Sequence, residues 1–268
     1  MSSPHRWTRS KVRNGFRTAT LSSWEVFDGF LRKGMPDTRG YVWRGQRDAN
    51  WKLTSTFDRL TEKSLVGLDP ALEGDYRGYL ADNHLESFKL SVRGRRGSHP
   101  SRIEDEDEWW AIGQHQGLAT PLLDWTESPF VALYFAFLEA AESHGTMRSV
   151  WALSSYKAAS PFGPVLSAAF ESKPKIKFVR PKLDENSRLV AQAGLFTRAP
   201  RGTTVEEWVQ NTFEPTSEVV LVQIKLPDVD RSECLKALDL MNINQLTLFP
   251  DLYGASQHCN AALESEML

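Results

Sequence analysis

The sequence lacks the features that mark secreted, metal-stapled or membrane-spanning proteins. Its 268 residues include only two cysteines, Cys234 and Cys259, and these form neither a metal-ligand spacing nor a disulfide framework. No run of about 18 apolar residues is present to span a bilayer, and the first residues contain no apolar segment of the kind found in secretory signals. We therefore expect a cytoplasmic protein with no membrane association and no bound metal.

A strong charge of one sign is also missing, because 32 basic and 34 acidic residues give a formal net charge of −2. This excludes a general attraction to nucleic acid or membrane. Basic residues do gather locally: residues 1–24 contain five and no acidic residue, and the loop 93–102 contains four. Either segment could contact nucleic acid. The alternative for residues 1–21 is a loosely ordered, solubilising arm.

No internal repeat and no long linker rich in glycine, serine or proline divides the chain. With 41% hydrophobic and 11% aromatic residues, it has enough material for a large core. We predict one domain over residues 22–254, between the basic arm at 1–21 and a polar tail at 255–268. Helical and β-prone segments both occur, and the clearest strand covers 218–226. The expected fold class is α+β, with a mixed or antiparallel sheet and flanking helices.

The chain is organised around residues 114–129, QHQGLATPLLDWTESP, which lead into an apolar segment at 130–138. Ser128 is a suitable N-cap and Pro129 a suitable first residue for a helix that we expect to extend to Ser143, with Gly145 as its C-cap. Because the first half of this helix is apolar on every side, it must be buried. Its N-terminus would favour an anion. The alternative is that Asp124, Thr126 and Ser128 only cap a core helix.

A second informative segment is YVWRGQ at 41–46, a β-prone run that ends with Arg44 and Gly45. A half-buried guanidinium must find a carboxylate, phosphate or carbonyl partner. Gly45 would let either the backbone or a ligand come close. Arg44 could bind a ligand, or it could form a structural ion pair with an acid such as Asp124.

Several polar side chains lie at the ends of apolar segments, and Gln192 lies within one, RLVAQAGLFT at 188–197. Each such group would cost roughly 1–3 kcal/mol if it were buried without a partner. We therefore predict that they share one cleft, with the N-terminus of the helix beginning at Pro129 as its floor. The predicted set is Arg44, Gln46, His115, Asp124, Thr126 and Gln192.

Four blocks occur in a defined order: WRGQ at 43–46, QHQGLATPLLDWTESPFVALYFA at 114–136, RLVAQAGLFT at 188–197 and LFPDLYG at 248–254. This combination resembles the FRG domain, a family named for an aromatic-Arg-Gly motif, over about residues 22–254. Trp43 stands where the family name has phenylalanine, and Gln116 and Ala119 replace an aromatic residue and a proline. Members of the family resemble parts of bacterial mobile-element, prophage and defence loci, which implies a toxin or an antiphage effector.

The strand that ends in aromatic-Arg-Gly, followed by a hydroxyl-rich strand that leads into a helix, is also similar to the Arg and Ser-Thr motifs of ADP-ribosyltransferases. This resemblance implies an ADP-ribosyltransferase-like fold with NAD as substrate and no metal. Arg44 would hold NAD, and Thr126 and Ser128 would support its nicotinamide half. The glutamate of those enzymes has no counterpart in 188–196, so Gln192, Asp124 and Glu218 are competing candidates.

The candidate site extends beyond these motifs. A broken nicotinamide–ribose bond leaves oxocarbenium character, which calls for a diphosphate clamp, an aromatic wall and a carboxylate near the ribose. His115 could act as a general base or be a satisfied core histidine. The candidate catalytic residues are Arg44, His115, Asp124, Gln192 and Glu218, and the candidate NAD-binding residues are Arg44, Gly45, Gln46, Gln114, Trp125, Thr126, Ser128 and Phe196.

Three functions remain open. The first is an ADP-ribosyltransferase that modifies a nucleic acid or protein acceptor, with a possible antitoxin. The second is a non-catalytic module that senses a nucleotide or a partner. The third is a hydrolase, either an NAD glycohydrolase or a nuclease. Transfer would leave ADP-ribose on a polymer, hydrolysis would leave it free, and a sensing module would bind without turnover.

Overall fold

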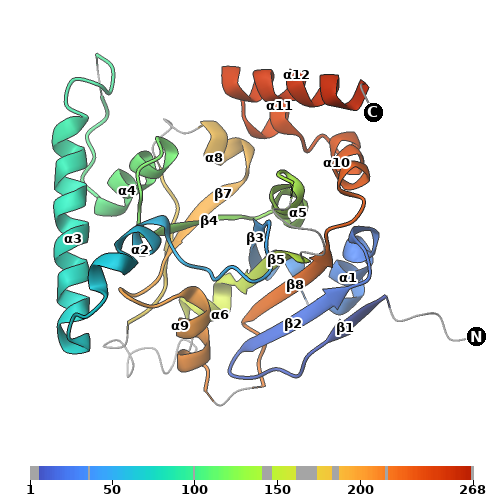
Figure 1. Cartoon of the computed structure of the whole chain (residues 1–268), viewed down its shortest axis with the longest axis horizontal. Helices are drawn as coiled ribbons and strands as arrows, with labels where there is room; N and C mark the ends of the chain where they lie inside the picture. The colour runs from blue at the N-terminus through green and yellow to red at the C-terminus, as the bar shows by residue number, and fades with distance from the viewer. Residues whose placement is uncertain are drawn as a thin grey trace, which may run out of the picture.

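The structure is a computed structural model that describes residues 6–266, apart from Pro36, His99 and the segments 141–146, 161–173, 183–186 and 215–216. Its described residues form an eight-stranded sheet with helices around it (Figure 1). The strands are β1 Trp7–Arg9, β2 Phe16–Leu21, β3 Tyr41–Gln46, β4 Leu122–Thr126, β5 Met147–Ser154, β6 Lys177–Val179, β7 Gly194–Arg198 and β8 Leu221–Pro227. Their order in the sheet is β1-β2-β8-β5-β3-β4-β7-β6. All pairings are antiparallel except that of β2 with β8, which confirms the predicted mixed sheet with flanking helices.

Helices surround the sheet, and Figure 1 shows α3 along one side of the molecule and α10, α11 and α12 together near the C-terminus. They are α1 Phe27–Gly34, α2 Thr56–Thr61, α3 Pro70–Ser91, α4 Glu106–His115, α5 Pro129–Phe137, α6 Ser155–Ala159, α8 Ser187–Ala191, α9 Val205–Thr212, α10 Arg231–Leu240, α11 Gln245–Leu248 and α12 Leu252–Glu266. Short 3-10 helices cover Trp24–Val26, Thr38–Gly40 and Glu62–Leu65. None of the helices in the described ranges is both long and apolar enough to cross a membrane.

The core is divided by the sheet, because side chains on a strand alternate between its two faces. Tyr41 and Trp43 of β3 pack with α5 and α1 on one face. Val42 belongs to a second cluster, which includes Trp151 of β5 and Trp208 of α9, on the other face. A third cluster joins α3 and α4 to β4 and β7. The central strands are therefore covered on both sides, and β3 lies between two layers of the core.

The two ends of the chain differ from the prediction. A loosely ordered arm over residues 1–21 is wrong for the described residues from 6 onward, because β1 and β2 extend the sheet and β2 pairs in parallel with β8. Ala19 and Leu21 of β2 are buried in the core. The polar tail expected at 255–268 is instead part of α12, at least as far as Glu266. Both ends thus belong to the same folded unit as the rest of the chain.

Helix α5 is capped as predicted by Ser128, whose hydroxyl accepts a hydrogen bond from the Val131 amide at 3.3 Å. It ends at Phe137, however, and the predicted extension to Ser143 is wrong as far as the structure describes it; Gly145 lies outside the described residues. Arg148 donates to the carbonyl oxygens of Ala136 and Glu139, and Arg231 donates to those of Phe137 and Leu138. Two guanidinium groups therefore satisfy the carbonyl groups at which the helix stops.

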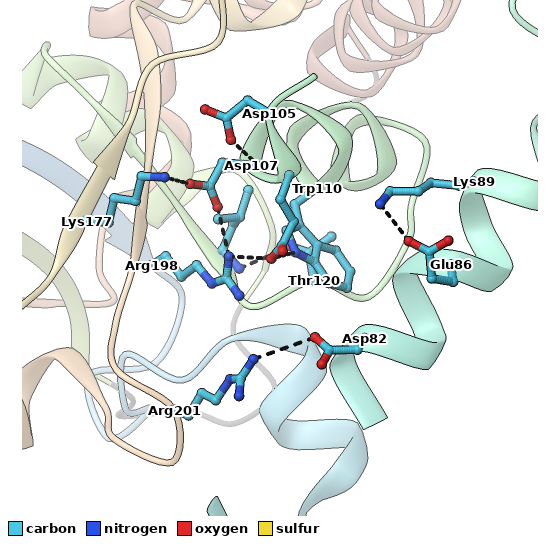
Figure 2. A network of polar contacts seen from close by, with 12 residues as sticks. Asp82, Glu86, Lys89, Asp105, Asp107, Trp110, Thr120, Lys177, Arg198 and Arg201 are labelled. Carbon is cyan, nitrogen blue, oxygen red and sulfur yellow. Dashed lines mark hydrogen bonds and ion pairs between the residues drawn. The ribbon is translucent and has the colours of Figure 1, made fainter. Parts of the chain in front are cut away.

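A polar network anchors the N-terminal part of α4 to the sheet (Figure 2). Arg198 of β7 donates to Glu106 at 2.8 Å and to the buried Asp107 at 3.0 Å, and Lys177 of β6 also pairs with Asp107. Burial opposes the ionisation of Glu106, but hydrogen bonds from Arg198 and Trp110 lower its pKa. Because this end of α4 is fixed to β6 and β7, its last residues, Gln114 and His115, are held in a defined place.

Candidate functional site

A pocket of about 740 Å³ lies where β3 and β4 diverge. The two strands pair at a single position, Trp43 with Thr126, whereas β3 pairs with β5 at six positions. Both strands contribute to the lining, together with the loop after β3, α2, and the ends of α4 and α5. Residues from α8, β7 and the segment after α11 complete it. The lining residues are Trp43, Arg44, Gly45, Gln46, Arg47, Trp51, Lys52, Thr54, Arg59, Gln114, His115, Asp124, Trp125, Thr126, Phe135, Leu138, Glu139, Arg188, Leu189, Gln192, Phe196 and Phe249.

A hub of three side chains joins β3, β4 and α4. Arg44 Nη1 donates to the backbone oxygen of Asp124 at 2.8 Å and lies 3.3 Å from its Oδ2. Gln114 Nε2 donates to Asp124 Oδ1 at 2.7 Å, and Gln114 Oε1 accepts a hydrogen bond from Thr120. The Asp124 side chain is nevertheless 64% exposed. Its carboxylate is oriented from two sides and remains open to the pocket.

The ion pair between Arg44 and Asp124, which the sequence offered as the structural alternative, is therefore present. It does not satisfy the arginine completely. Arg44 Nε is buried and makes no hydrogen bond within the described part of the chain. A buried donor without a partner costs free energy.

Gly45 is required by the packing of α5 on β3. A Cβ atom at this position would overlap the carbonyl oxygen of Ala132 and come within 2.5 Å of the Ala136 nitrogen. Of the two explanations left open by the sequence, backbone or ligand, the close approach belongs to the backbone of α5. The glycine also lines the pocket, so α5 and the site share this position.

Gln192 and Thr126 connect the walls of the pocket. Thr126 Oγ1 donates to the backbone oxygen of Gln192 at 2.7 Å and accepts from the Ser128 amide at 3.0 Å. Gln192 Nε2 donates to the Leu248 oxygen at 3.0 Å. These bonds tie β4, α8 and α11 together, so both side chains position the pocket.

Gln46 and Trp125 are also engaged in hydrogen bonds. Gln46 accepts from Trp151 Nε1 at 2.7 Å and donates to the Lys52 oxygen at 3.3 Å. Trp125 Nε1 donates to Thr197 at 2.8 Å. Trp125 belongs to the second core cluster and Phe196 to the third, and both buried residues are part of the pocket lining.

Two predicted site residues lie outside the lining, and both placements are corrections. Ser128 uses its hydroxyl to cap α5, and α5 reaches the pocket through Phe135 near its other end. The predicted floor at the N-terminus of the helix is therefore wrong. Glu218 lies before β8, which begins at Leu221, and its carboxylate pairs with Lys157 of α6 at 3.2 Å. It is therefore not on a strand beside β4.

The sequence prediction missed most of the positive charge in the pocket. Among the described residues, the lining has five cationic side chains, those of Arg44, Arg47, Lys52, Arg59 and Arg188, and two acidic ones, those of Asp124 and Glu139, so their formal charge is 5 − 2 = +3. The whole chain carries −2. The sequence feature that could have indicated this charge is the presence of four basic residues between positions 44 and 59, on both sides of Trp51.

Arg59 and His115 show how this charge acts on its neighbours. Partial burial of its guanidinium, and then the charge of Arg44, lower the pKa of Arg59. Its guanidinium donates hydrogen bonds to two neutral groups, the Thr54 oxygen at 2.6 Å and the Thr56 hydroxyl at 3.3 Å. Burial and the charge of Arg188 lower the pKa of His115, against the opposing effect of Asp251. His115 is therefore neutral near pH 7.

The C-terminal part of the chain closes the pocket opposite β3. Arg188 Nε lies 2.6 Å from Asp251 Oδ2, and its guanidinium lies over the rings of Phe249 and Tyr253 at 5.4 and 5.5 Å. Phe249 meets Phe135 of α5 edge to face at 6.1 Å. This wall combines a cation with aromatic rings.

The part of the chain that contains the hub matches a known family model, over residues 39–145, and that model is the FRG domain. Residues 39–145 are similar to the FRG domain. The family resemblance inferred from the sequence is thereby confirmed over residues 39–145, and the blocks at 188–197 and 248–254 lie outside the match. No curated protein and no solved structure matches the chain. The FRG domain supplies Arg44, Gln114 and Asp124, whereas Arg188 and Phe249 lie beyond the matched range.

Proposed function

We propose that this FRG domain protein is an NAD-dependent ADP-ribosyltransferase that acts as a toxin or phage-defence effector on a macromolecular acceptor. The observation that carries the proposal is the pocket, whose described lining has a formal charge of +3 and includes the exposed carboxylate of Asp124, which Arg44 and Gln114 orient. A dinucleotide offers a diphosphate to the cations, flat rings to the aromatic walls and ribose hydroxyls to the carboxylate. Among the described residues, no group of three or more potential ligand side chains is placed to hold a metal ion.

In the proposed reaction the bond between nicotinamide and ribose breaks, and its electron pair leaves with the nicotinamide nitrogen. A new bond forms between C1′ of the ribose and a nucleophilic atom of the acceptor, which loses its proton. Positive charge develops on the ribose in the transition state, where a fixed carboxylate stabilises it. Because Gln114 and Arg44 already hold the carboxylate of Asp124, it needs no reorganisation during the reaction.

The acceptor's proton needs a base, and His115 fits this role. It lines the same pocket, and its lowered pKa keeps the imidazole neutral near pH 7, where it can accept a proton. Arg44 and Arg59 would hold the diphosphate, since guanidinium groups bind phosphate oxygens in pairs. Trp125 and Phe196 would contact the nicotinamide half.

The decisive experiment incubates the purified chain with NAD labelled in the adenylate phosphate and with a cell lysate. Separate digestion with protease and with nuclease then shows whether the label is on protein or on nucleic acid. Free ADP-ribose as the only product would identify a hydrolase instead. Binding of NAD without release of nicotinamide would identify a sensing module. Either of these two results would overturn the transferase.

The matched variants are Arg44→Lys and Arg39→Lys. Arg44→Lys should lower the rate of transfer at least about 100-fold. The planar guanidinium can donate hydrogen bonds to the Asp124 oxygens and to a phosphate at once, and a single ammonium group cannot. Arg39 is 94% exposed and lies outside the pocket, so its lysine variant should behave as the wild type. Expression of the wild-type chain should slow bacterial growth, and expression of the Arg44 variant should not. Full transfer by Arg44→Lys would contradict the assigned role.

A further inference from the structure

The loop between β3 and α2 is fixed by hydrogen bonds to several elements. The Ala49 amide donates to the Met147 oxygen at 2.7 Å, and the Ala49 oxygen accepts from Gln223 Nε2 at 2.6 Å. The Leu53 amide donates to Glu206 at 2.7 Å. Because these contacts hold the main chain on both sides of residue 51, the loop presents that side chain in a defined position.

That side chain is Trp51, which is part of the pocket lining. It is 43% exposed, and the other eight tryptophans, all within the described residues, are buried or half-buried. The guanidinium of Arg47 lies over the Trp51 ring at 5.1 Å and pairs with Glu139 at 2.5 Å. A tryptophan that is left accessible on a fixed loop gives up hydrophobic burial, which a flat ligand would restore.

We propose that Trp51 is the platform on which the adenine of the dinucleotide stacks, an inference that rests on the proposed function. A purine offers a π-face that matches the indole, and the Arg47 contact fixes the plane of the ring. Arg59, which lines the same pocket and forms no ion pair with a described residue, would hold the diphosphate beside the base, together with Arg44. The non-reacting half of the substrate is thereby assigned to residues 51–59, and the reacting half to Asp124 and His115.

The local charge favours a small nucleotide over a nucleic-acid strand at this position. Arg47 is paired with Glu139 at 2.5 Å, and Lys52 lies 3.6 Å from Glu207. These pairs leave little net charge near Trp51, whereas a polynucleotide requires a continuous positive track along its backbone. Arg59, which forms no ion pair with any described residue, lies in the pocket beside the proposed base.

The test measures binding of ADP and of inorganic pyrophosphate by isothermal titration calorimetry, in the absence of NAD. Trp51→Ala should weaken ADP binding roughly 5- to 150-fold, the range for loss of one stacked base, and leave pyrophosphate binding unchanged. Trp51→Phe, which keeps an aromatic face, should stay within a few-fold of the wild type. Tyr156→Ala removes an aromatic side chain that is 69% exposed outside the pocket, and it should change neither ligand.

The outcomes separate this inference from the proposed function. If ADP binds as expected but no nicotinamide is released from NAD, the base platform stands and the transferase fails. If Trp51→Ala transfers ADP-ribose from NAD to an acceptor with the same KM as the wild type, the platform fails and the transferase stands. Equal weakening of ADP and pyrophosphate, or no binding of ADP by the wild type, overturns the inference. The inference is also overturned if Trp51→Ala weakens the binding of a single-stranded oligonucleotide but not the binding of ADP, because the ring would then contact the acceptor.

Discussion

The substitution that separates chemistry from structure most sharply is Asp124→Asn. It keeps the shape of the side chain and removes one negative charge. One oxygen remains to accept from either Gln114 or Arg44, and the amide nitrogen that replaces the other oxygen cannot accept. The bond from Arg44 to the backbone oxygen of residue 124, at 2.8 Å, does not depend on the side chain and should persist.

The expected loss of stability is small. The Arg44 and Asp124 side chains are 20% and 64% exposed, so their ion pair contributes at most about 1 kcal/mol. Loss of the hydrogen bond from Gln114, at 2.7 Å, adds roughly 1 kcal/mol. Together these predict a decrease of about 1–2 kcal/mol in the free energy of unfolding, or about 2–8 °C in Tm. The fold should therefore survive.

The expected loss of activity is far larger, because a fixed charge next to the developing oxocarbenium ion contributes roughly 10²–10³ in rate. Binding of an anion should change in the opposite direction. The formal charge of the lining rises from +3 to +4, so ADP should bind at least as tightly as it does to the wild type. A lower kcat with unweakened ADP binding is the signature of a residue that acts in the transition state.

The assay combines nicotinamide release from NAD, ADP titration and thermal unfolding on the same preparations. Glu127→Gln is the control, because Glu127 is an acidic residue outside the pocket that pairs with Arg180 at 2.5 Å. The reasoning is refuted if Asp124→Asn retains most of its kcat. It is also refuted if the variant loses more than about 10 °C in Tm, because Asp124 would then be a structural partner of Arg44.

Two further predictions concern the fold and the proposed base. Gly45→Ala should lower the free energy of unfolding by about 3 kcal/mol or more in a urea titration, because the new methyl group meets the backbone of α5, whereas Gly40→Ala has no atom within 4 Å of its Cβ and should be near neutral. Equal midpoints for both variants would contradict the packing argument. The pKa of His115 is below its usual 6.5, so kcat should be constant above pH 7 and fall only below about pH 6.5 as the base is protonated, and His115→Gln should remove this dependence. A decline that begins above pH 7 would exclude His115 as the base.

The hub was predictable because its residues carry local signals. Arg44 follows aromatic residues in a β-prone run, and Asp124 precedes a helix with a recognisable cap and an apolar first half, so both had to lie at the edge of a buried segment. Burial then forces such groups to find partners. The roles of these residues in binding and catalysis remain predictions, and the ADP-ribosyltransferase-like fold remains a proposal.

Other features had no local signal. β2 enters the sheet by pairing with β8, about two hundred residues away in the chain, and its basic, hydroxyl-rich sequence FRTATL has the composition of a solvated arm. Arg59 and Arg188 lie on short helices whose orientation depends on tertiary contacts. The early end of α5 depends on Arg148 and Arg231, which come from later parts of the chain. Such long-range contacts leave no periodic pattern in the sequence.

The site depends on residues outside the family match for its geometry as well as for its walls. Gly45 and α5 lie within the match, and Phe135 of α5 meets Phe249, which lies outside it, at the far side of the pocket. Arg148, which is fully buried and paired with Asp228 at 2.6 Å, caps the end of α5. Because a buried pair of this kind is costly to break, it fixes α5 against small displacements. The hub within residues 39–145 thus supplies the polar groups of the site, and the later segments determine the size and shape of the ligand that reaches them.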